Sequence, residues 1–161
     1  MSNVFPSRKS IRLTEYDYSQ NGAYFITICT KDRKRLLWEN VGTGNARPPR
    51  LSPNGFIVEN AIQNIPSHYP MVCIDKYVVM PNHIHILLRI DVETNGRAMP
   101  APTISTIIQQ MKGYVTKQIG WCIWQRSFHD HVIRDQGDYD DIYRYIENNP
   151  LQWEQDELYT A

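Results

Sequence analysis

The chain has 161 residues, a formal net charge of zero and a hydrophobic content of 42%. These values are typical of one ordinary globular domain with a real core, so residues 1–161 are expected to form a single domain. No apolar run approaches the ~20 residues that a membrane-spanning helix needs, and the N-terminus lacks the apolar segment of a signal peptide. A membrane-spanning protein is therefore excluded, and we expect no membrane partner.

The cysteines Cys29, Cys73 and Cys122 are odd in number and widely spaced. This spacing excludes a CxxC-type zinc site and a disulfide framework. It favours reduced thiols in a cytoplasmic protein.

The zero net charge hides an asymmetry along the chain. Residues 1–50 carry nine Lys and Arg against four acids, whereas residues 135–161 carry eight acids and one basic residue. Aromatic residues are interleaved with the cations, and a surface of this kind can contact a phosphate backbone. Solvated surface charge is the plainer interpretation. The cations assigned to such a contact surface are Arg8, Lys9, Arg12, Lys31, Arg33, Lys34 and Arg35.

The first part of the chain predicts a strand and a helix between irregular segments. Residues 1–21 are polar and predict a surface arm, while Ala23–Thr30 is rich in β-branched and aromatic residues, which favours a strand. Residues 42–53 hold Gly, Pro and Asn and predict an exposed loop. From Asn54 apolar residues recur at helical spacing, and this helix is expected to end before Pro66.

The central part predicts two adjacent strands followed by a loop. The apolar runs Met71–Met80 and His83–Ile90 are separated by Pro81-Asn82, a turn sequence that favours antiparallel pairing. Residues 91–102 predict a second loop.

The next segment completes the sheet. An apolar stripe predicts a helix that Thr103 or Ser105 caps and Gly120 ends, and the alternation in Phe128–Ile133 predicts a fourth strand. A last helix, Tyr139–Asn149, is expected to start at Asp138 and to stop before Pro150. The order before this last helix is βαββαβ, which predicts an α+β fold with a ferredoxin-like or RRM-like antiparallel sheet.

Two histidines open the third predicted strand. Side chains alternate between the faces of a strand, so His83 and His85 are expected on one face, ~7 Å apart, where they could hold a divalent metal ion. Polar residues hydrogen-bonded to nearby backbone at a strand start are the alternative. His129 and His131 form a second alternating pair, but no helix with further ligands accompanies them, which favours structural or nucleic-acid contacts.

The last predicted helix supplies a second set of candidate residues. At 100° per residue, Tyr145 lies outside the apolar stripe, and Asn149 is its neighbour one turn later. Tyr145 is therefore available as a hydroxyl nucleophile, and the Asn149 carbonyl oxygen could ligate the same cation as the histidines. A packing tyrosine and a helix-capping asparagine are the alternative. The stripe consists of Tyr139, Ile142, Tyr143 and Ile146.

Three motifs in this chain resemble those of a known family. The run YVVMPNHIHILLRI at 77–90 resembles the His-hydrophobic-His (HUH) motif of single-tyrosine transposases. The run IWQRSFHDHVIR at 123–134, followed by YIENNP at 145–150, resembles the end of the REP-associated tyrosine transposases. The three motifs stand in the family's order, and the resemblance runs from about Tyr16 to Trp153.

This resemblance implies an RRM-like fold, bound Mg²⁺ or Mn²⁺, and single-stranded or hairpin DNA that is cut and rejoined through a transient 5′-phosphotyrosine bond. By motif, His83 and His85 are metal ligands, Asn149 is the third ligand and Tyr145 is the nucleophile. Arg126 and Arg134 lie in the second motif and are expected to contact DNA phosphates. The family implies a monomer or a homodimer, in the cytoplasm and associated with the nucleoid.

Three alternatives remain open. Tyr114 is a second candidate nucleophile, although its helical position favours packing at the core edge. A histidine-triad nucleotide hydrolase needs a third alternating histidine, and Leu87 occupies that place. A non-catalytic nucleic-acid-binding module, including a domesticated transposase, would expose aromatic residues on its central strands, where only Tyr77 is available.

Overall fold

The computed structural model describes residues 22–39, 50–91 and 102–158. Its centre is a four-stranded antiparallel sheet in the order β2-β3-β1-β4. The strands are β1 (Gly22–Cys29), β2 (Val72–Val79), β3 (His83–Ile90) and β4 (His129–Ile133). The predicted α+β, ferredoxin-like plan is therefore confirmed.

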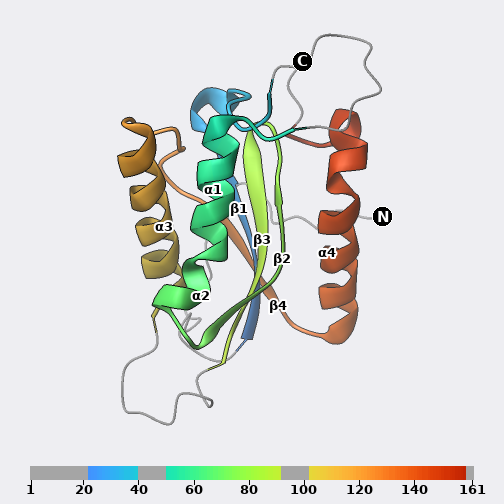
Figure 1. Ribbon diagram of the computed structural model, residues 1–161. Coiled ribbons are helices and arrows are strands. Elements are labelled where there is room, and N and C mark those ends of the chain that lie inside the picture. Colours follow the sequence, from blue (N-terminus) through green and yellow to red (C-terminus); the bar gives the residue numbers. More distant parts are fainter. Residues whose placement is uncertain (1–21, 40–49, 92–101, 159–161) are drawn as a thin grey trace.

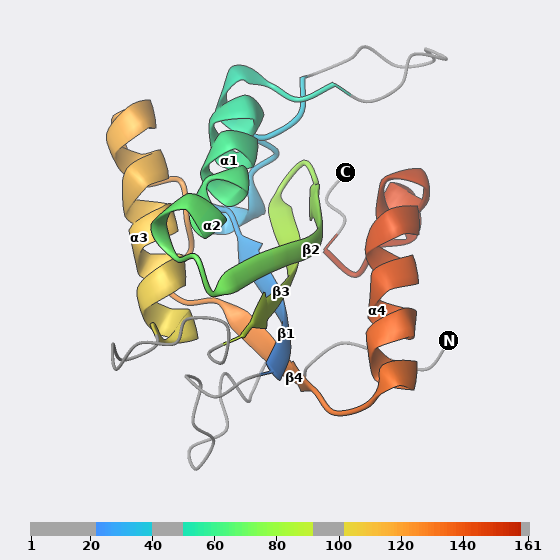
Figure 2. The ribbon, with the colours of Figure 1, turned by 60° about the horizontal axis from the view of Figure 1, so that its bottom comes forward.

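Helices cover both faces of the sheet (Figures 1 and 2). On one face lie α1 (Pro53–Gln63), the short α2 (Ile65–His68) and α3 (Ile104–Ile119). On the other face lies α4 (Gln136–Asn148). No helix in the described ranges is long and apolar enough to cross a membrane.

The central strands β1 and β3 bury side chains on both faces, which is why the sheet can be covered on both sides. The first apolar cluster, under α1 and α3, takes Tyr24, Ile26 and Ile28 from β1. The second cluster, under α4, is smaller and consists of Phe25, Leu87, Ile142 and Ile146. Because the register pairs Phe25 with Leu87 and Thr27 with His85, polar residues follow directly after this second cluster on the α4 face.

The far end of the sheet also holds α4. Tyr139, in the first turns of α4, donates its hydroxyl hydrogen to Asp75 of β2 at 2.7 Å, and the Arg89 guanidinium contacts the same carboxylate at 2.6 Å. Asp75 lies at an irregularity in the register between β2 and β3. The start of α4 is thereby fixed to β2.

Several predicted boundaries move because the capping residues differ from those expected. Asp135, not Asp138, caps α4 by accepting from the Asp138 amide at 2.8 Å, so the helix starts at Gln136. The helix predicted to end before Pro66 breaks at Asn64, and Pro66 lies in the first turn of α2. Thr103 caps α3, and Gly120 ends it with a positive φ of 98°, both as predicted.

Parts of other predictions lie outside the described residues. These are the surface arm 1–21, most of the loop 42–53 and most of the loop 91–102.

Two helical glycines give a matched test of the packing. A Cβ at Gly55 would overlap the Leu37 carbonyl oxygen and press on Leu51, whereas a Cβ at Gly113 would meet nothing within 4 Å. Gly55→Ala should therefore lower the free energy of unfolding by about 3 kcal/mol, because backbone cannot move aside easily. Gly113→Ala should raise it by about 0.5–1 kcal/mol through helix propensity. Urea unfolding measures both, and equal effects would contradict the packing of α1 on the Leu37 segment.

Candidate active site

The structure places His83 and His85 on the α4 face of β3, with ring centroids 4.6 Å apart. Both side chains are buried, with 0% and 1% of each residue exposed. The paired orientation expected from strand alternation is therefore present in the fold. Burial of two imidazoles side by side sets the electrostatics of the site.

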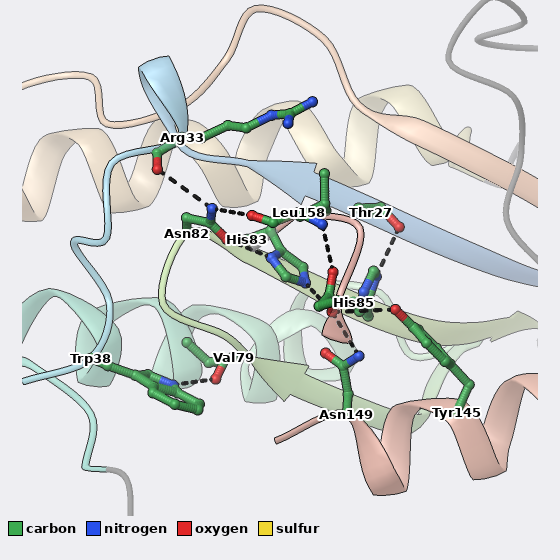
Figure 3. A network of polar contacts seen from close by, with 11 residues as sticks. Thr27, Arg33, Trp38, Val79, Asn82, His83, His85, Tyr145, Asn149 and Leu158 are labelled. Atoms are coloured by element: carbon green, nitrogen blue, oxygen red, sulfur yellow. Dashed lines mark hydrogen bonds and ion pairs between the residues drawn. The ribbon is translucent and has the colours of Figure 1, made fainter. Parts of the chain in front are cut away.

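Each imidazole is oriented by a hydrogen bond at Nδ1. His83 Nδ1 lies 2.7 Å from Asn82 Oδ1, and His85 Nδ1 lies 2.8 Å from Thr27 Oγ1 on the neighbouring strand (Figure 3). Asn82 Oδ1 can only accept, so Nδ1 of His83 carries a proton and the ring directs Nε2 toward Asp156. Partners of this kind are what orient metal-ligating histidines in proteins.

Tyr145 reaches the histidines from α4. Its ring centroid lies 5.4 Å from that of His85 and 6.2 Å from that of Phe25. The side chain is half-buried and packs against the second apolar cluster. Although Tyr145 lies outside the predicted apolar stripe, its ring covers the edge of that cluster while its hydroxyl faces polar groups.

A carboxylate that sequence reasoning missed completes the cluster. After α4 the chain turns back through a 3₁₀ segment, Asn149–Gln155, and Asp156 returns toward the histidines with 1% of its side chain exposed. Asp156 Oδ2 accepts from Asn149 Nδ2 at 2.9 Å and from the Tyr145 hydroxyl at 3.4 Å. The same oxygen lies 3.6 Å from His83 Nε2. Figure 3 shows these contacts converging between β3 and α4.

The segment that carries Asp156 is attached to the turn before β3. The Leu158 amide donates to Asp156 Oδ1 at 2.8 Å, and Asn82 Nδ2 donates to the Leu158 carbonyl at 2.6 Å. Trp153 lies over His83, with ring centroids 6.1 Å apart. Asn82 thus contacts His83 through its oxygen and the Asp156 segment through its nitrogen.

Burial and charge set the protonation of the site. Burial and the neighbouring His83 hold the pKa of His85 well below its usual value, so this imidazole is neutral at pH 7. Burial alone would raise the pKa of Asp156, but the hydrogen bond and charge of His83 outweigh it and lower that pKa. Burial and the Asp156 charge raise the pKa of Tyr145, so its hydroxyl keeps its proton.

The donor atoms of His83, His85 and Asp156 could hold a metal ion, because they all lie within 4.8 Å of one another. Ligand atoms 2.0–2.3 Å from one shared ion lie at most roughly 4.5 Å apart, so only a small contraction is required. Asn149, the third ligand predicted from the family motif, is also buried, with 2% exposed. Its amide nitrogen faces Asp156, and its Oδ1 has no hydrogen-bond partner within the described residues.

A cavity of about 120 Å³ opens beside this cluster. Its walls include His85, Tyr145 and Asp156, together with Arg33 and His129. His129 lies across β1 from His85, because Thr27 pairs with both residues. Of the second predicted histidine pair, His129 therefore lines the same cavity, while His131 Nε2 makes a 2.7 Å hydrogen bond with Asp138.

The remaining predicted site residues are spread over the molecule. Lys34 and Arg35 are exposed after β1, and Lys31 and Arg126 line a separate pocket beside α3. Arg134 lies at the other end of the sheet, where it lines a pocket together with Arg89. Arg89 is six residues, or about 20 Å, along β3 from His83. Arg8, Lys9 and Arg12 lie outside the described residues.

Tyr114, the second candidate nucleophile, is on α3 and therefore across the sheet from the two histidines. It is 45% exposed.

A ferredoxin-like sheet with a His-hydrophobic-His pair, faced by a tyrosine on the helix after the last strand, is the arrangement of a single-tyrosine transposase. The chain belongs to the family of IS200-like transposases, whose sequence profile matches residues 18–149.

The chain is also similar to individual proteins. The chain is 37% identical to an uncharacterised protein of Haemophilus influenzae, over 94% of this chain and 93% of the relative. It is 26% identical to a candidate REP-associated tyrosine transposase of the same organism, over 84% of this chain and 74% of the relative. Its fold is similar to that of a solved REP-associated tyrosine transposase bound to a REP hairpin, with a TM-score of 0.63, 24% identity and coverage of 87% and 74% of the two chains.

The Thr27–His85 hydrogen bond can be tested directly. Thr27→Val keeps the shape of the side chain but leaves His85 Nδ1 without its hydroxyl partner. The free energy of unfolding should fall by about 1–3 kcal/mol, and the ¹⁵N shifts of the His85 ring should show a changed tautomer mixture. Thr27→Ser retains the hydroxyl and should retain the tautomer of the parent protein. An unchanged tautomer in Thr27→Val would contradict the assigned contact.

Proposed function

We propose that this chain is a metal-dependent DNA nuclease and strand transferase, which cuts and rejoins single-stranded or hairpin DNA through a 5′-phosphotyrosine bond at Tyr145. The observation that carries the proposal is the meeting of three kinds of group in one cluster, beside a cavity that His85, Tyr145 and Asp156 line. These are a tyrosine hydroxyl, a pair of oriented imidazoles and a buried carboxylate. Membership of a transposase family supports the same reaction class.

The residues fit a divalent cation. His83, His85 and Asp156 would hold Mg²⁺ or Mn²⁺, and Asn149 would join them through Oδ1, the buried atom that has no hydrogen-bond partner within the described part of the chain. Two imidazoles that each hydrogen-bond through Nδ1 present Nε2 as the ligand atom. When bound, such an ion supplies charge neutralisation at the scissile phosphate.

The reaction itself is a transesterification at phosphorus. The Tyr145 hydroxyl gives up its proton, its oxygen forms a bond to the scissile phosphorus, and the bond from phosphorus to the 3′ oxygen breaks. The 3′ oxygen takes up a proton and leaves as a free 3′-OH. Because one phosphodiester replaces another, a second 3′-OH can reverse the attack and join two strands without a nucleotide cofactor.

The raised pKa of Tyr145 opposes the first of these steps. Part of that rise comes from the charge of Asp156, whose Oδ2 lies 3.4 Å from the hydroxyl. Engaging Asp156 as a ligand would remove this contribution and make the hydroxyl easier to ionise. Asp156 would thus link the binding of the cation to activation of the nucleophile.

The DNA partner is proposed from charge and from the solved relative. Arg33 is half-buried in the cavity wall and can contact a phosphate next to the reacting one. The solved relative is bound to a REP hairpin, which supports a hairpin or single-stranded substrate here. The two histidines and Tyr145 meet within one chain, which supports a monomer as a complete unit of the proposed site, with a homodimer as the alternative.

Tyr145→Phe removes one oxygen and keeps the ring that covers the second apolar cluster. Its stability should change by less than ~1 kcal/mol, because the lost hydrogen bond is long. Incubation with a hairpin oligonucleotide and Mn²⁺ should give a protein–DNA adduct on denaturing gels for the unmodified protein and none for Tyr145→Phe. Tyr114→Phe is the matched control and should form the adduct normally.

Peptide mapping of the adduct decides the nucleophile. An adduct that persists in Tyr145→Phe would move the chemistry to another residue. DNA binding without any adduct, at every metal tested, would favour a domesticated DNA-binding protein.

Calorimetric titration with Mn²⁺ tests the ligand set. The double variant His83→Ala/His85→Ala should lose binding. Asp156→Asn should weaken it at least ~10-fold, because losing a side chain that contacts the ion costs no less than losing a residue that only orients such a side chain. His131→Ala replaces a histidine that pairs with Asp138 outside the cluster, and it should bind Mn²⁺ as the parent protein does.

The same titration compares the two remaining candidate ligands. Full affinity in Asp156→Asn together with lost affinity in Asn149→Ala would leave Asn149 as the third ligand and Asp156 as its hydrogen-bond partner only.

A further inference from the structure

We propose that a basic pocket beside α3, separate from the active-site cavity, binds a backbone phosphate of the DNA substrate. Its lining includes Lys31, Lys112, Thr116, Trp124 and Arg126. The inference rests on the proposed function in one respect only: it takes the ligand to be DNA.

The charge of the pocket favours an anion. Lys31 comes from the turn Lys31–Arg33 after β1, Lys112 from α3, and Arg126 from the segment before β4. Among the described residues, no Asp or Glu lines the pocket, and none of the three cations makes an ion pair. Three cations from three separate segments therefore surround one concavity without a counterion from those ranges.

Two donors, one half-buried and one buried, show that the pocket is more than exposed side chains. Lys112 is half-buried, and its Nζ donates to the Gln125 carbonyl at 2.8 Å, which holds the ammonium group at the wall and leaves it further hydrogens to donate. Trp124 is 3% exposed, and its Nε1 hydrogen has no hydrogen-bond partner within the described part of the chain. A phosphate offers several acceptor oxygens, and buried donors of this kind normally have an acceptor.

The position of the pocket connects it to the active site. Gln125 lines both cavities, and its backbone N–H donates to the Cys29 carbonyl of β1 at 2.9 Å. Lys31 lines the basic pocket, whereas Arg33, two residues later, lines the active-site cavity. A DNA strand whose scissile phosphate lies at the histidine pair could therefore pass the Gln125 wall and place another phosphate on Lys112.

The turn between the two cavities has an uncommon backbone. Asp32 and Arg33 both have positive φ, 57° and 53°, a region that residues other than glycine rarely occupy. The Lys31 amide donates to the Ile123 carbonyl at 2.7 Å, which fixes the start of this turn to the segment that leads to Trp124. This left-handed turn thus places Lys31 at the basic pocket and Arg33 at the active-site cavity.

The test measures binding without chemistry, in the full-length chain carrying Tyr145→Phe. Fluorescence anisotropy gives the affinity for a hairpin oligonucleotide with a single-stranded flank, at several salt concentrations. Adding Lys112→Gln should weaken binding roughly 3- to 10-fold at low salt and reduce the slope of log K against log salt by about 0.7, the value for one phosphate contact on a single strand. Lys117→Gln, an exposed lysine on the same helix outside the pocket, is the matched control and should leave the slope unchanged.

A second oligonucleotide, trimmed flush with the stem, identifies the source of the phosphate. If the effect of Lys112→Gln disappears with the trimmed hairpin, the phosphate belongs to the single-stranded flank. If it persists, with a slope change of about 0.9, the phosphate belongs to the duplex stem. Either result supports the pocket. Equal slopes for Lys112→Gln and Lys117→Gln on both oligonucleotides would overturn it.

The outcome is separable from that of the proposed function. Equal slopes together with a Tyr145 adduct in the unmodified protein would remove the pocket and leave the nuclease. A changed slope without an adduct would leave the pocket and remove the nuclease, and absence of any DNA binding would overturn both. If Lys112→Gln does not fold, Arg126→Gln replaces an exposed cation of the same pocket and carries the same expectation.

Discussion

The pairing of β1 with β3 is the constraint on which the rest of the structure depends. Both strands are central and buried on both faces, and their antiparallel register sets Thr27 opposite His85 and Cys29 opposite His83. A shift of one residue would send the histidines to the face under α1 and α3 and the apolar residues of β3 to the face under α4. The apolar alternation of β3 that builds the first cluster therefore also fixes the side on which chemistry can occur.

Burying two imidazoles costs free energy of desolvation, and hydrogen bonds and charge from neighbouring polar residues offset this cost. Thr27 and Asn82 satisfy the two Nδ1 atoms, and Asp156 supplies negative charge beside His83. Isolated buried charges are unfavourable, so the carboxylate and the histidines stabilise one another only as a group. The same group lowers the pKa of Asp156 and raises that of Tyr145, which makes the nucleophile dependent on the state of its neighbours.

The sequence predicts those features that depend on local periodicity. The same-face placement of His83 and His85 follows from strand alternation, and the cap at Thr103 and the end at Gly120 follow from residue type. Asp156 could not be found this way. It lies seven residues beyond Asn149, within an acid-rich stretch, and it reaches the site through contacts such as Asn82–Leu158, which join residues 76 positions apart.

The partial burial of Tyr145 was missed for a related reason. A helical apolar stripe predicts contact along one face of the helix only. In the structure Phe25 of β1 also contacts Tyr145, which lies beside that stripe.

The contact of Tyr139 with Asp75 has a mechanical consequence. Near its start, α4 is hydrogen-bonded to Asp75 of β2, and directly after its end Asn149 is hydrogen-bonded to Asp156. The helix is therefore held at two points roughly 15 Å apart. Tyr145 lies between these two contacts, so both of them together set its position over the histidines. The irregularity of β2 at Asp75 thus helps to position the Tyr145 hydroxyl without contacting it. The position of the proposed nucleophile therefore depends in part on a strand at the edge of the sheet.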